Sequence, residues 1–169
     1  MSTSTFAAGA GLALLAVLGL TGVTAGACPG DGPEVVLDCF SLAYSDRSLE
    51  VLESVLAPDY IWVAVSPPQV EIFEREVSVA SSVKMFGSPE LEAVSLEFRD
   101  GYSLVKGDEP DTWRLEDLMA TLTVKKAGAE EPSTAPLCVT LYVRKIGGEN
   151  PGYEVYREVF FEGEGCVGK

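Results

Sequence analysis

Two long segments of alternating apolar and polar residues, joined by a loop of turn-forming residues, most constrain the fold of this chain. They are Trp113–Lys126 and Leu137–Ile146, and the loop is Gly128–Pro136. The apolar positions that share one face are Leu118, Ala120, Leu122 and Val124 in the first segment and Leu137, Val139, Leu141 and Val143 in the second. Successive side chains of a strand point to opposite faces, so this pattern predicts an antiparallel hairpin with one buried face.

Shorter stretches rich in β-forming residues predict further strands. They are Tyr60–Val65, Val70–Phe73, Leu91–Arg99, Tyr102–Val105 and Tyr153–Phe161. Turn-forming residues separate them: Pro67-Pro68 closes the first strand, Asp100-Gly101 predicts a turn, and Gly147–Gly152 predicts a hairpin loop.

Three segments have helical periodicity: Pro33–Tyr44, Ser48–Ala57 and Glu74–Phe86. The apolar positions expected to be buried are Val36, Cys39, Phe40 and Ala43 in the first, Leu49, Leu52 and Leu56 in the second, and Val79, Val83 and Phe86 in the third. Ser48 is predicted to cap the N-terminus of the second helix, and Pro58 to end it. Helices followed by a long antiparallel meander predict an α+β domain, with the three helices packed on one face of the sheet.

Several of these segments together resemble the NTF2-like (SnoaL-like, cystatin-fold) domains. The similarity is carried by the spacing and residue classes of Phe40–Tyr44, Leu49–Leu52, Leu56–Trp62, Phe73–Glu76 and Tyr153–Tyr156, and it extends over about residues 33–161. It implies a cone-shaped fold in which a curved sheet wraps around a helix and leaves a pocket. Members of the family include enzymes, small-molecule binders and dimerising modules, so the resemblance leaves the activity open.

The ketosteroid-isomerase-like members carry a catalytic tyrosine in the first helix and a general-base aspartate on the first strand. Aligned on the turn before Leu49, this chain has Phe40 and Ala64 at those positions. Phe40 has no hydroxyl to donate to an enolate oxygen, and Ala64 cannot accept a proton. We therefore predict no catalytic residues of that kind.

Histidine is absent from the sequence. This excludes Ser-His-Asp and Cys-His catalysis and removes the commonest zinc ligand. The sequence also has no Cys-x-x-Cys motif and no glycine-rich phosphate loop between a strand and a helix, so neither a metal nor a cofactor is predicted. The alternative of an isomerase- or dehydratase-like enzyme requires a buried carboxylate. Glu116 and Asp117 are adjacent carboxylates within a predicted strand, and Glu116 would qualify if it shared the buried face of Leu118.

Aromatic residues are the better candidates for a binding site, because tyrosine and tryptophan combine an apolar body with a hydrogen-bonding tip. The predicted ligand-binding residues are Phe40, Tyr44, Trp62, Phe86, Tyr102, Trp113 and Tyr142. Ordinary core packing is the alternative for each. We therefore expect a non-catalytic domain that binds a small, mostly apolar ligand or a partner protein in its cone. A third alternative is a homodimer that buries an exposed sheet patch of Tyr142, Tyr156 and Phe160.

The N-terminal segment predicts export. Phe6 to Ala27 carries no charge, and its strongest apolar centre is Leu12–Leu20. This short centre is typical of a cleaved signal peptide, predicted over residues 1–27. A retained membrane-spanning helix is the alternative, because about 20 apolar residues suffice to cross a bilayer.

Cys28 follows Ala25-Gly26-Ala27, which partly resembles a bacterial lipobox. Lipid attachment at Cys28 would make the protein a membrane-anchored lipoprotein of the cell envelope, with residues 28–33 as a tether. Otherwise Cys28 is one of four cysteines in a periplasmic or secreted domain, and the pairing is open. A bridge between Cys138 and Cys166 is plausible, and Cys39 is expected to be a buried free thiol.

The sequence carries 26 acidic and 12 basic residues, all beyond the leader, for a net charge of −14. Such a charge repels phosphate backbones and argues against nucleic-acid binding. It also opposes electrostatic binding to anionic lipid head groups, so membrane attachment would depend on a lipidated Cys28. The predicted organisation is a signal peptide (1–27), a tether (28–33), an NTF2-like domain (34–162) and a C-terminal tail (163–169).

Overall fold

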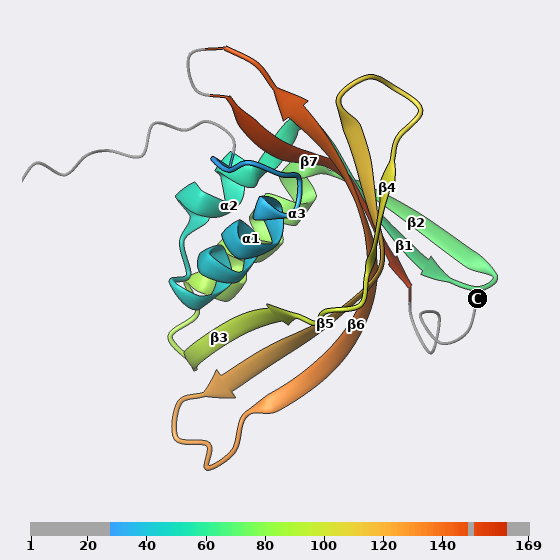
Figure 1. The fold of residues 1–169 in the computed structure, drawn as a ribbon. Helices are drawn as coiled ribbons and strands as arrows, with labels where there is room; N and C mark the ends of the chain where they lie inside the picture. The colour runs from blue at the N-terminus through green and yellow to red at the C-terminus, as the bar shows by residue number, and fades with distance from the viewer. Residues whose placement is uncertain (1–27, 149–150, 162–169) are drawn as a thin grey trace, which may run out of the picture.

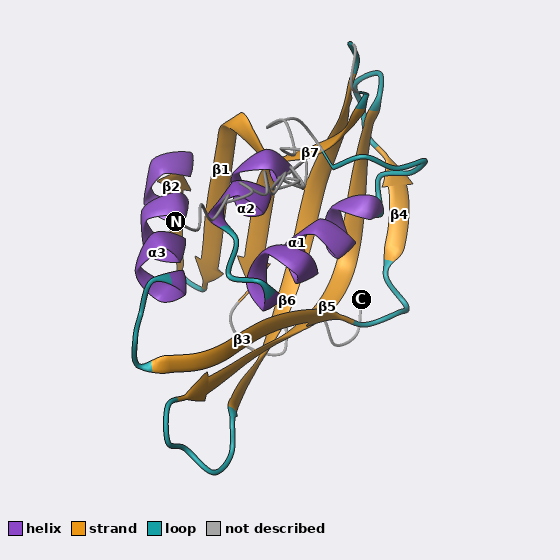
Figure 2. Ribbon diagram, turned by 90° about the vertical axis from the view of Figure 1, so that its left-hand side faces the viewer, coloured by secondary structure: helices purple, strands orange, loops and turns teal. Residues whose placement is uncertain are grey.

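The computed structural model describes residues 28–148 and 151–161, which form three helices and a seven-stranded sheet. The helices are α1 (Val35–Ser45), α2 (Leu49–Val55) and α3 (Arg75–Phe86). The strands are β1 (Leu56–Ser66), β2 (Gln69–Glu74), β3 (Leu91–Phe98), β4 (Ser103–Lys106), β5 (Thr112–Lys126), β6 (Ser133–Ile146) and β7 (Gly152–Phe161). All three helices lie on the concave side of a strongly bent sheet, as Figures 1 and 2 show. The predicted α+β class and the placement of the helices are confirmed.

The strand order is β2-β1-β7-β6-β5-β3, and β4 also pairs with β5. β1 and β7 run parallel, so the sheet is mixed and the predicted all-antiparallel meander is wrong at this point. The turn at Asp100-Gly101 does not close a hairpin either. Instead β3 and β4 pair side by side with the two halves of the long strand β5.

Most element boundaries agree with the sequence. Ser48 caps α2 as predicted, because its Oγ accepts a hydrogen bond from the Val51 N–H at 3.3 Å. Leu56 and the following residue belong to β1 instead of α2, since the residue before Pro58 disfavours helical backbone. The loop predicted over Gly128–Pro136 is shorter than expected, because Ser133 to Pro136 pair with β5.

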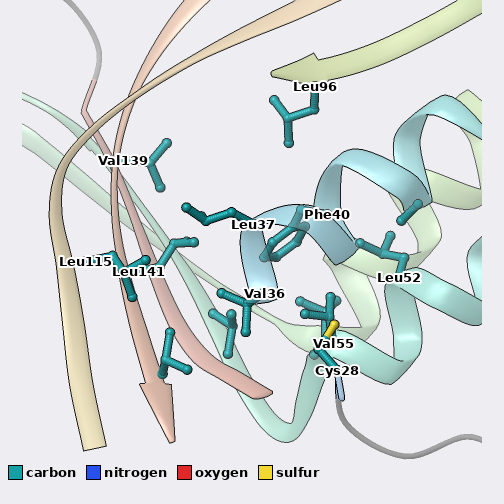
Figure 3. Close-up of a cluster of buried hydrophobic side chains, with 14 of the residues drawn as sticks. Cys28, Val36, Leu37, Phe40, Leu52, Val55, Leu96, Leu115, Val139 and Leu141 are labelled. Carbon is teal, nitrogen blue, oxygen red and sulfur yellow. The ribbon is translucent and has the colours of Figure 1, made fainter. Parts of the chain in front are cut away.

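The core lies between α1, α2 and the concave face of the sheet, as Figure 3 shows. Buried side chains from the helices and from the sheet face one another in this core. They include Val36, Leu37, Phe40, Leu52 and Val55 from the helices and Leu96, Leu115, Val139 and Leu141 from the sheet. Burying each of these side chains stabilises the fold by roughly 1.5–3 kcal/mol before the entropy of ordering it is subtracted.

Helix α3 is rotated relative to the prediction. Of the expected stripe, Phe86 is buried and Val79 packs partly against the core, whereas Val83 is 48% exposed and Ser82 is only 7% exposed. The helix therefore turns serines toward the sheet. Periodicity of apolar residues alone could not indicate this, because valines occur on both sides of α3.

Arg47 fastens the end of α3 to the rest of the domain. It lies after α1 with φ of 53°, in the left-handed region. Its guanidinium donates hydrogen bonds to the carbonyl oxygens of Phe86, Ser88 and Leu91. The planar guanidinium thus binds the carbonyl of the last residue of α3, which has no intrahelical partner, and two carbonyls of the segment that leads into β3.

Cys28 is bonded to Cys39 in a disulfide with the Cα atoms 6.3 Å apart. The Cys28 N–H also donates to the Tyr153 carbonyl at 3.0 Å, and the Tyr153 N–H donates back at 3.0 Å. The segment predicted as a tether (28–33) therefore starts inside the fold, with Cys28 only 1% exposed. The prediction of a free thiol at Cys39 is wrong, because the chain folds back from α1 and brings Cys28 against it.

Lipid attachment at Cys28 and this disulfide exclude each other, since both need the same sulfur. The structure favours the alternative in which Cys28 belongs to an oxidised domain.

Cys138 is also disulfide-bonded. Its predicted partner, Cys166, lies outside the described residues, as do the predicted signal peptide (1–27) and the whole predicted C-terminal tail (163–169). Within 28–148 and 151–161, no helix is long and apolar enough to cross a membrane.

Replacing Arg47 tests its role at the end of α3. We expect Arg47→Ala to lower the free energy of unfolding by about 2 kcal/mol, because three partly buried carbonyl groups lose their donors. Arg99→Ala, which removes an exposed arginine, is the matched control and should change stability by less than about 0.5 kcal/mol. Urea denaturation of both variants provides the measurement, and equal stability of the two would contradict the assignment.

The fate of Cys28 is open to a direct test. Digestion without reducing agent should release a peptide pair joined through Cys28 and Cys39, which reduction separates. Mass spectrometry of the protein from a host that exports it provides the measurement. A diacylglyceryl adduct on the peptide that contains Cys28 would instead establish the lipoprotein.

Candidate functional site

Two adjoining cavities lie on the concave face of the sheet. The smaller has a volume of about 60 Å³ and the larger about 320 Å³, and both are bordered by Tyr44, Leu137 and Glu158. The remaining walls of the larger cavity are Tyr60, Trp62, Ser78, Ser81, Ser82, Met85 and Phe160. The remaining walls of the smaller are Phe40, Leu96, Phe98, Ala120, Leu122, Val139 and Leu141. The larger cavity therefore lies between α3 and the β1–β7 part of the sheet.

Glu158 reaches this cavity because of a β-bulge in β7. Leu141 pairs with Glu158 and Val143 pairs with Val155, so β7 uses one residue more than β6 between these pairs. Tyr156 is the extra residue. Side chains at directly paired positions share a face, which places Glu158 on the concave side with Leu141. Without the bulge, alternation from Val155 would send Glu158 to the outer face.

Tyr60 anchors the carboxylate of Glu158. Its hydroxyl donates a hydrogen bond to Glu158 Oε2 at 2.7 Å and is itself on a side chain only 3% exposed. The bond joins β1 to β7 at the point where these strands run parallel. A short O–H···O⁻ bond of this kind is among the stronger hydrogen bonds in proteins.

Burial governs the protonation of this group. Part of the Glu158 side chain remains accessible because it borders the cavities, but protein atoms surround it, and desolvation raises the pKa of its carboxyl above the ordinary 4.5. The Tyr60 hydrogen bond acts in the opposite direction. Burial, together with the charge of Glu158, also raises the pKa of Tyr44 and of Tyr60 above 10, so both hydroxyls stay protonated as donors.

The α3 side of the cavity is lined by small polar residues. Ser82 Oγ donates to the Ser78 carbonyl and Ser81 Oγ donates to the Val77 carbonyl, so both hydroxyls are satisfied within the helix. Ser78 Oγ lies beside the Tyr60 hydroxyl and interacts with it, and it makes no other hydrogen bond among the described residues. The wall therefore offers one hydroxyl, that of Ser78, which is not engaged within the helix and lies close to the Tyr60–Glu158 pair.

The structure places three of the seven predicted ligand-binding residues on the cavity walls: Phe40, Tyr44 and Trp62. Phe86 lies behind the wall, where its ring meets Tyr44 edge-on with centroids 5.4 Å apart. Tyr102, Trp113 and Tyr142 line neither cavity. Trp113 packs edge-on against Tyr153 at 5.6 Å, and Tyr102 borders the core from the loop before β4.

The outer face of the sheet carries the Tyr142–Tyr156 pair, whose ring centroids are 6.1 Å apart. The guanidinium of Arg157 lies 5.3 Å from the centre of the Tyr142 ring, and that of Arg144 lies 5.6 Å from Tyr156. Phe160, predicted to share this patch, lines the larger cavity instead. The bulge at Tyr156 is again the reason, because it shifts the alternation of every later residue in β7.

Glu116 and Asp117, the adjacent carboxylates singled out in the sequence, lie away from both cavities. They occupy a register shift between Leu115 and Leu118, both of which are completely buried. Glu116 forms an ion pair with Arg114 at 3.3 Å and is 35% exposed. The condition set for the enzyme alternative, that Glu116 share the buried face of Leu118, is not met, since the bulge breaks the alternation on which it depends. Among the described residues, no cluster of metal-ligating side chains is present.

Sequence reasoning missed Glu158 and Tyr60, the polar centre of the site. Glu158 is flanked by Arg157 and Val159, and simple alternation assigns it to solvent. The residues of β7 alone carry no clear signal for this reversal, because the bulge is defined by the pairing of β7 with β6.

No model of a protein family matches this chain, and no curated protein is similar to it in sequence. Solved structures do resemble it. A conserved protein from Planctomyces limnophilus superposes with a TM-score of 0.60 at 11% identity, over 76% of this chain and 91% of its own. An NTF2-like protein of unknown function in nutrient uptake from Rhodospirillum rubrum has a TM-score of 0.54 at 15% identity, over 78% and 98%.

A nuclear transport factor 2 (NTF2-like) superfamily protein from Salmonella enterica has a TM-score of 0.51 at 10% identity, over 79% of this chain and 92% of its own. These likenesses span most of each chain and define the class. The domain has the cone-shaped α+β fold of NTF2-like proteins, as the sequence resemblance implied. At these identities the comparisons establish the fold and leave the activity open.

The raised pKa of Glu158 predicts how stability depends on pH. A carboxyl whose pKa is higher in the folded chain than in the unfolded chain favours folding below about pH 4.5, and this contribution is lost as the pH rises through the folded-state pKa. We therefore expect Glu158→Gln to be more stable than the parent at pH 7.5, by about 0.5–2 kcal/mol. The difference should shrink as the pH falls toward 4.

Urea denaturation at pH 7.5 and pH 4 measures this difference. Glu116→Gln is the matched control, because it removes the same charge from a half-exposed ion pair and should have little effect at either pH. A Glu158→Gln variant that is less stable than the parent at pH 7.5 would show that the carboxylate is stabilised in the fold.

Proposed function

We propose that this protein is an exported, cell-envelope binding domain whose cone cavity holds a small, mostly apolar ligand. The observation that carries the proposal is the larger cavity, with a volume of about 320 Å³ between α3 and the sheet. Small-molecule sites typically enclose about 300–1,000 Å³ and combine apolar walls with a few fixed polar groups.

The walls fit this description. Trp62, Met85, Leu137 and Phe160 supply the apolar surface, and Glu158 with its Tyr60 partner supplies a polar group at a fixed position. Tyr44, Tyr60 and Glu158 all belong to helices or strands, so their positions are largely fixed before a ligand arrives.

Export is supported by two independent features. The uncharged leader with its leucine-rich centre is typical of a signal peptide. A disulfide between Cys28 and Cys39 is expected to persist in an oxidising compartment outside the cytosol. A periplasmic or secreted protein agrees with both, whereas a lipoprotein anchored through Cys28 would need the disulfide to be absent.

A second function, catalysis by a buried carboxylate, is favoured by one specific observation. Glu158 faces a cavity, has a raised pKa and accepts a hydrogen bond from Tyr60. Such a group can accept a proton from a bound substrate, with Tyr44 as a nearby donor. A ligand recovered from the protein in chemically altered form would favour this function over simple binding.

The dimer alternative draws less support from the geometry. Tyr142 and Tyr156 are each partly covered by a guanidinium group of the same chain. A partner would have to displace or accommodate these charges. Sedimentation as a monomer would count against this alternative.

Filling the cavity tests the proposed binding function. The probe is N-phenyl-1-naphthylamine, a neutral apolar dye that fluoresces when it leaves water. Leu137→Trp adds volume at a residue that borders both cavities, so dye binding should weaken about tenfold or more. Leu104→Trp, at an exposed position on β4, is the matched control and should bind like the parent. Equal binding by both variants would place the dye elsewhere and contradict the proposal.

A further inference from the structure

The buried carboxylate has no cationic partner in the part of the chain that the structure describes. Neither cavity is bordered by a lysine or an arginine. Arg157 is next to Glu158 in sequence, but the bulge turns it to the outer face, where it lies over Tyr142. Arg144 is engaged with Asp59 and Glu154. An ionised carboxylate taken out of water without a counter-charge is strongly unfavourable.

Hydrogen bonding satisfies only part of this group. A carboxylate has about four acceptor positions. Tyr60 occupies one of them, and Ser78 Oγ lies beside the Tyr60 hydroxyl. The acceptor capacity that remains faces the cavities, where a bound molecule can reach it.

Aromatic rings surround the same space. Tyr44, Tyr60, Trp62 and Phe160 border the larger cavity together with Glu158. Trp62 is held in place by stacking on Phe73, with ring centroids 4.8 Å apart. The faces of aromatic rings attract cations, and tryptophan does so most strongly. A carboxylate among such rings is suited to a positive charge on an apolar body.

We infer that the ligand of the larger cavity is an organic cation, an amine or quaternary ammonium group on an apolar body, with its charge against Glu158 and the aromatic rings. The inference rests on the proposed binding function and specifies the ligand class. The cation would supply the missing counter-charge. A neutral donor such as an alcohol would fill an acceptor position but leave the charge uncompensated. The net charge of −14 would further concentrate cations near the protein.

Two probes of nearly the same shape separate charge from shape: phenyltrimethylammonium, and tert-butylbenzene, in which carbon replaces the charged nitrogen. Binding to the full mature domain is measured by calorimetry or native mass spectrometry at fixed ionic strength. We expect the parent protein to bind the cation about tenfold more tightly than the neutral probe. Glu158→Gln should lose this preference and keep its affinity for tert-butylbenzene.

Glu116→Gln is the matched control, since it removes one negative charge from the same sheet outside the cavity. It should retain the preference for the cation. If Glu116→Gln reduces cation binding as much as Glu158→Gln does, the effect comes from overall charge and the inference fails. If the parent binds the neutral probe as tightly as the cation or more tightly, the cationic class is wrong and the binding function stands. If the parent binds neither probe but still binds N-phenyl-1-naphthylamine, the cationic class is wrong and the binding function stands; if it binds none of the three, both fail.

Discussion

The bend of the sheet is the constraint on which the rest of this domain depends. Register shifts occur in the ladders β5–β6, β6–β7 and β1–β7, and a further one lies at the start of β3 in the β3–β5 ladder. The first two flank Leu141, which pairs with Leu115 on one side and with Glu158 on the other. A bulge bends a strand and increases its local twist. Because these shifts lie side by side across neighbouring strands, together they bend the whole sheet around the helices. The concave face, the packing of α1 and α2 against it, and the cavity beside α3 all follow from this bend.

The same shifts explain how far the sequence could be interpreted. Alternation correctly predicted the buried faces of β5 over Leu118–Val124 and of β6 over Leu137–Val143. The first run begins after the bulge of β5, and β6 contains no extra residue. It failed for Glu116 in β5 and for Glu158 and Phe160 in β7, where an extra residue reverses inside and outside. A bulge is set by the pairing of a strand with its neighbour. The residues of one strand, considered alone, therefore carry little sign of it.

The cavity itself results from a contrast between helices. α1 fills the cone with Val36, Leu37 and Phe40, whereas the only fully buried residues of α3 are Ser82 and Phe86. Serine side chains are too small to reach the sheet, so the space between α3 and β7 stays open. Helical periodicity predicted that α3 exists and where it ends. Valines on both sides of the helix concealed the serine face that creates the site.

Glu158 combines the effects of the β7 bulge and of the small residues of α3. Its position opposite Leu141 makes it part of the sheet's inner surface, and the small residues of α3 leave the space in front of it unfilled. An apolar residue at this position would bury more surface and avoid the desolvation of a charge, so fold stability alone gives no reason for a carboxylate. Tyr60 compensates part of that desolvation and fixes the orientation of the group. A polar group that opposes stability, is held in one orientation and faces an open cavity has the properties of a recognition element.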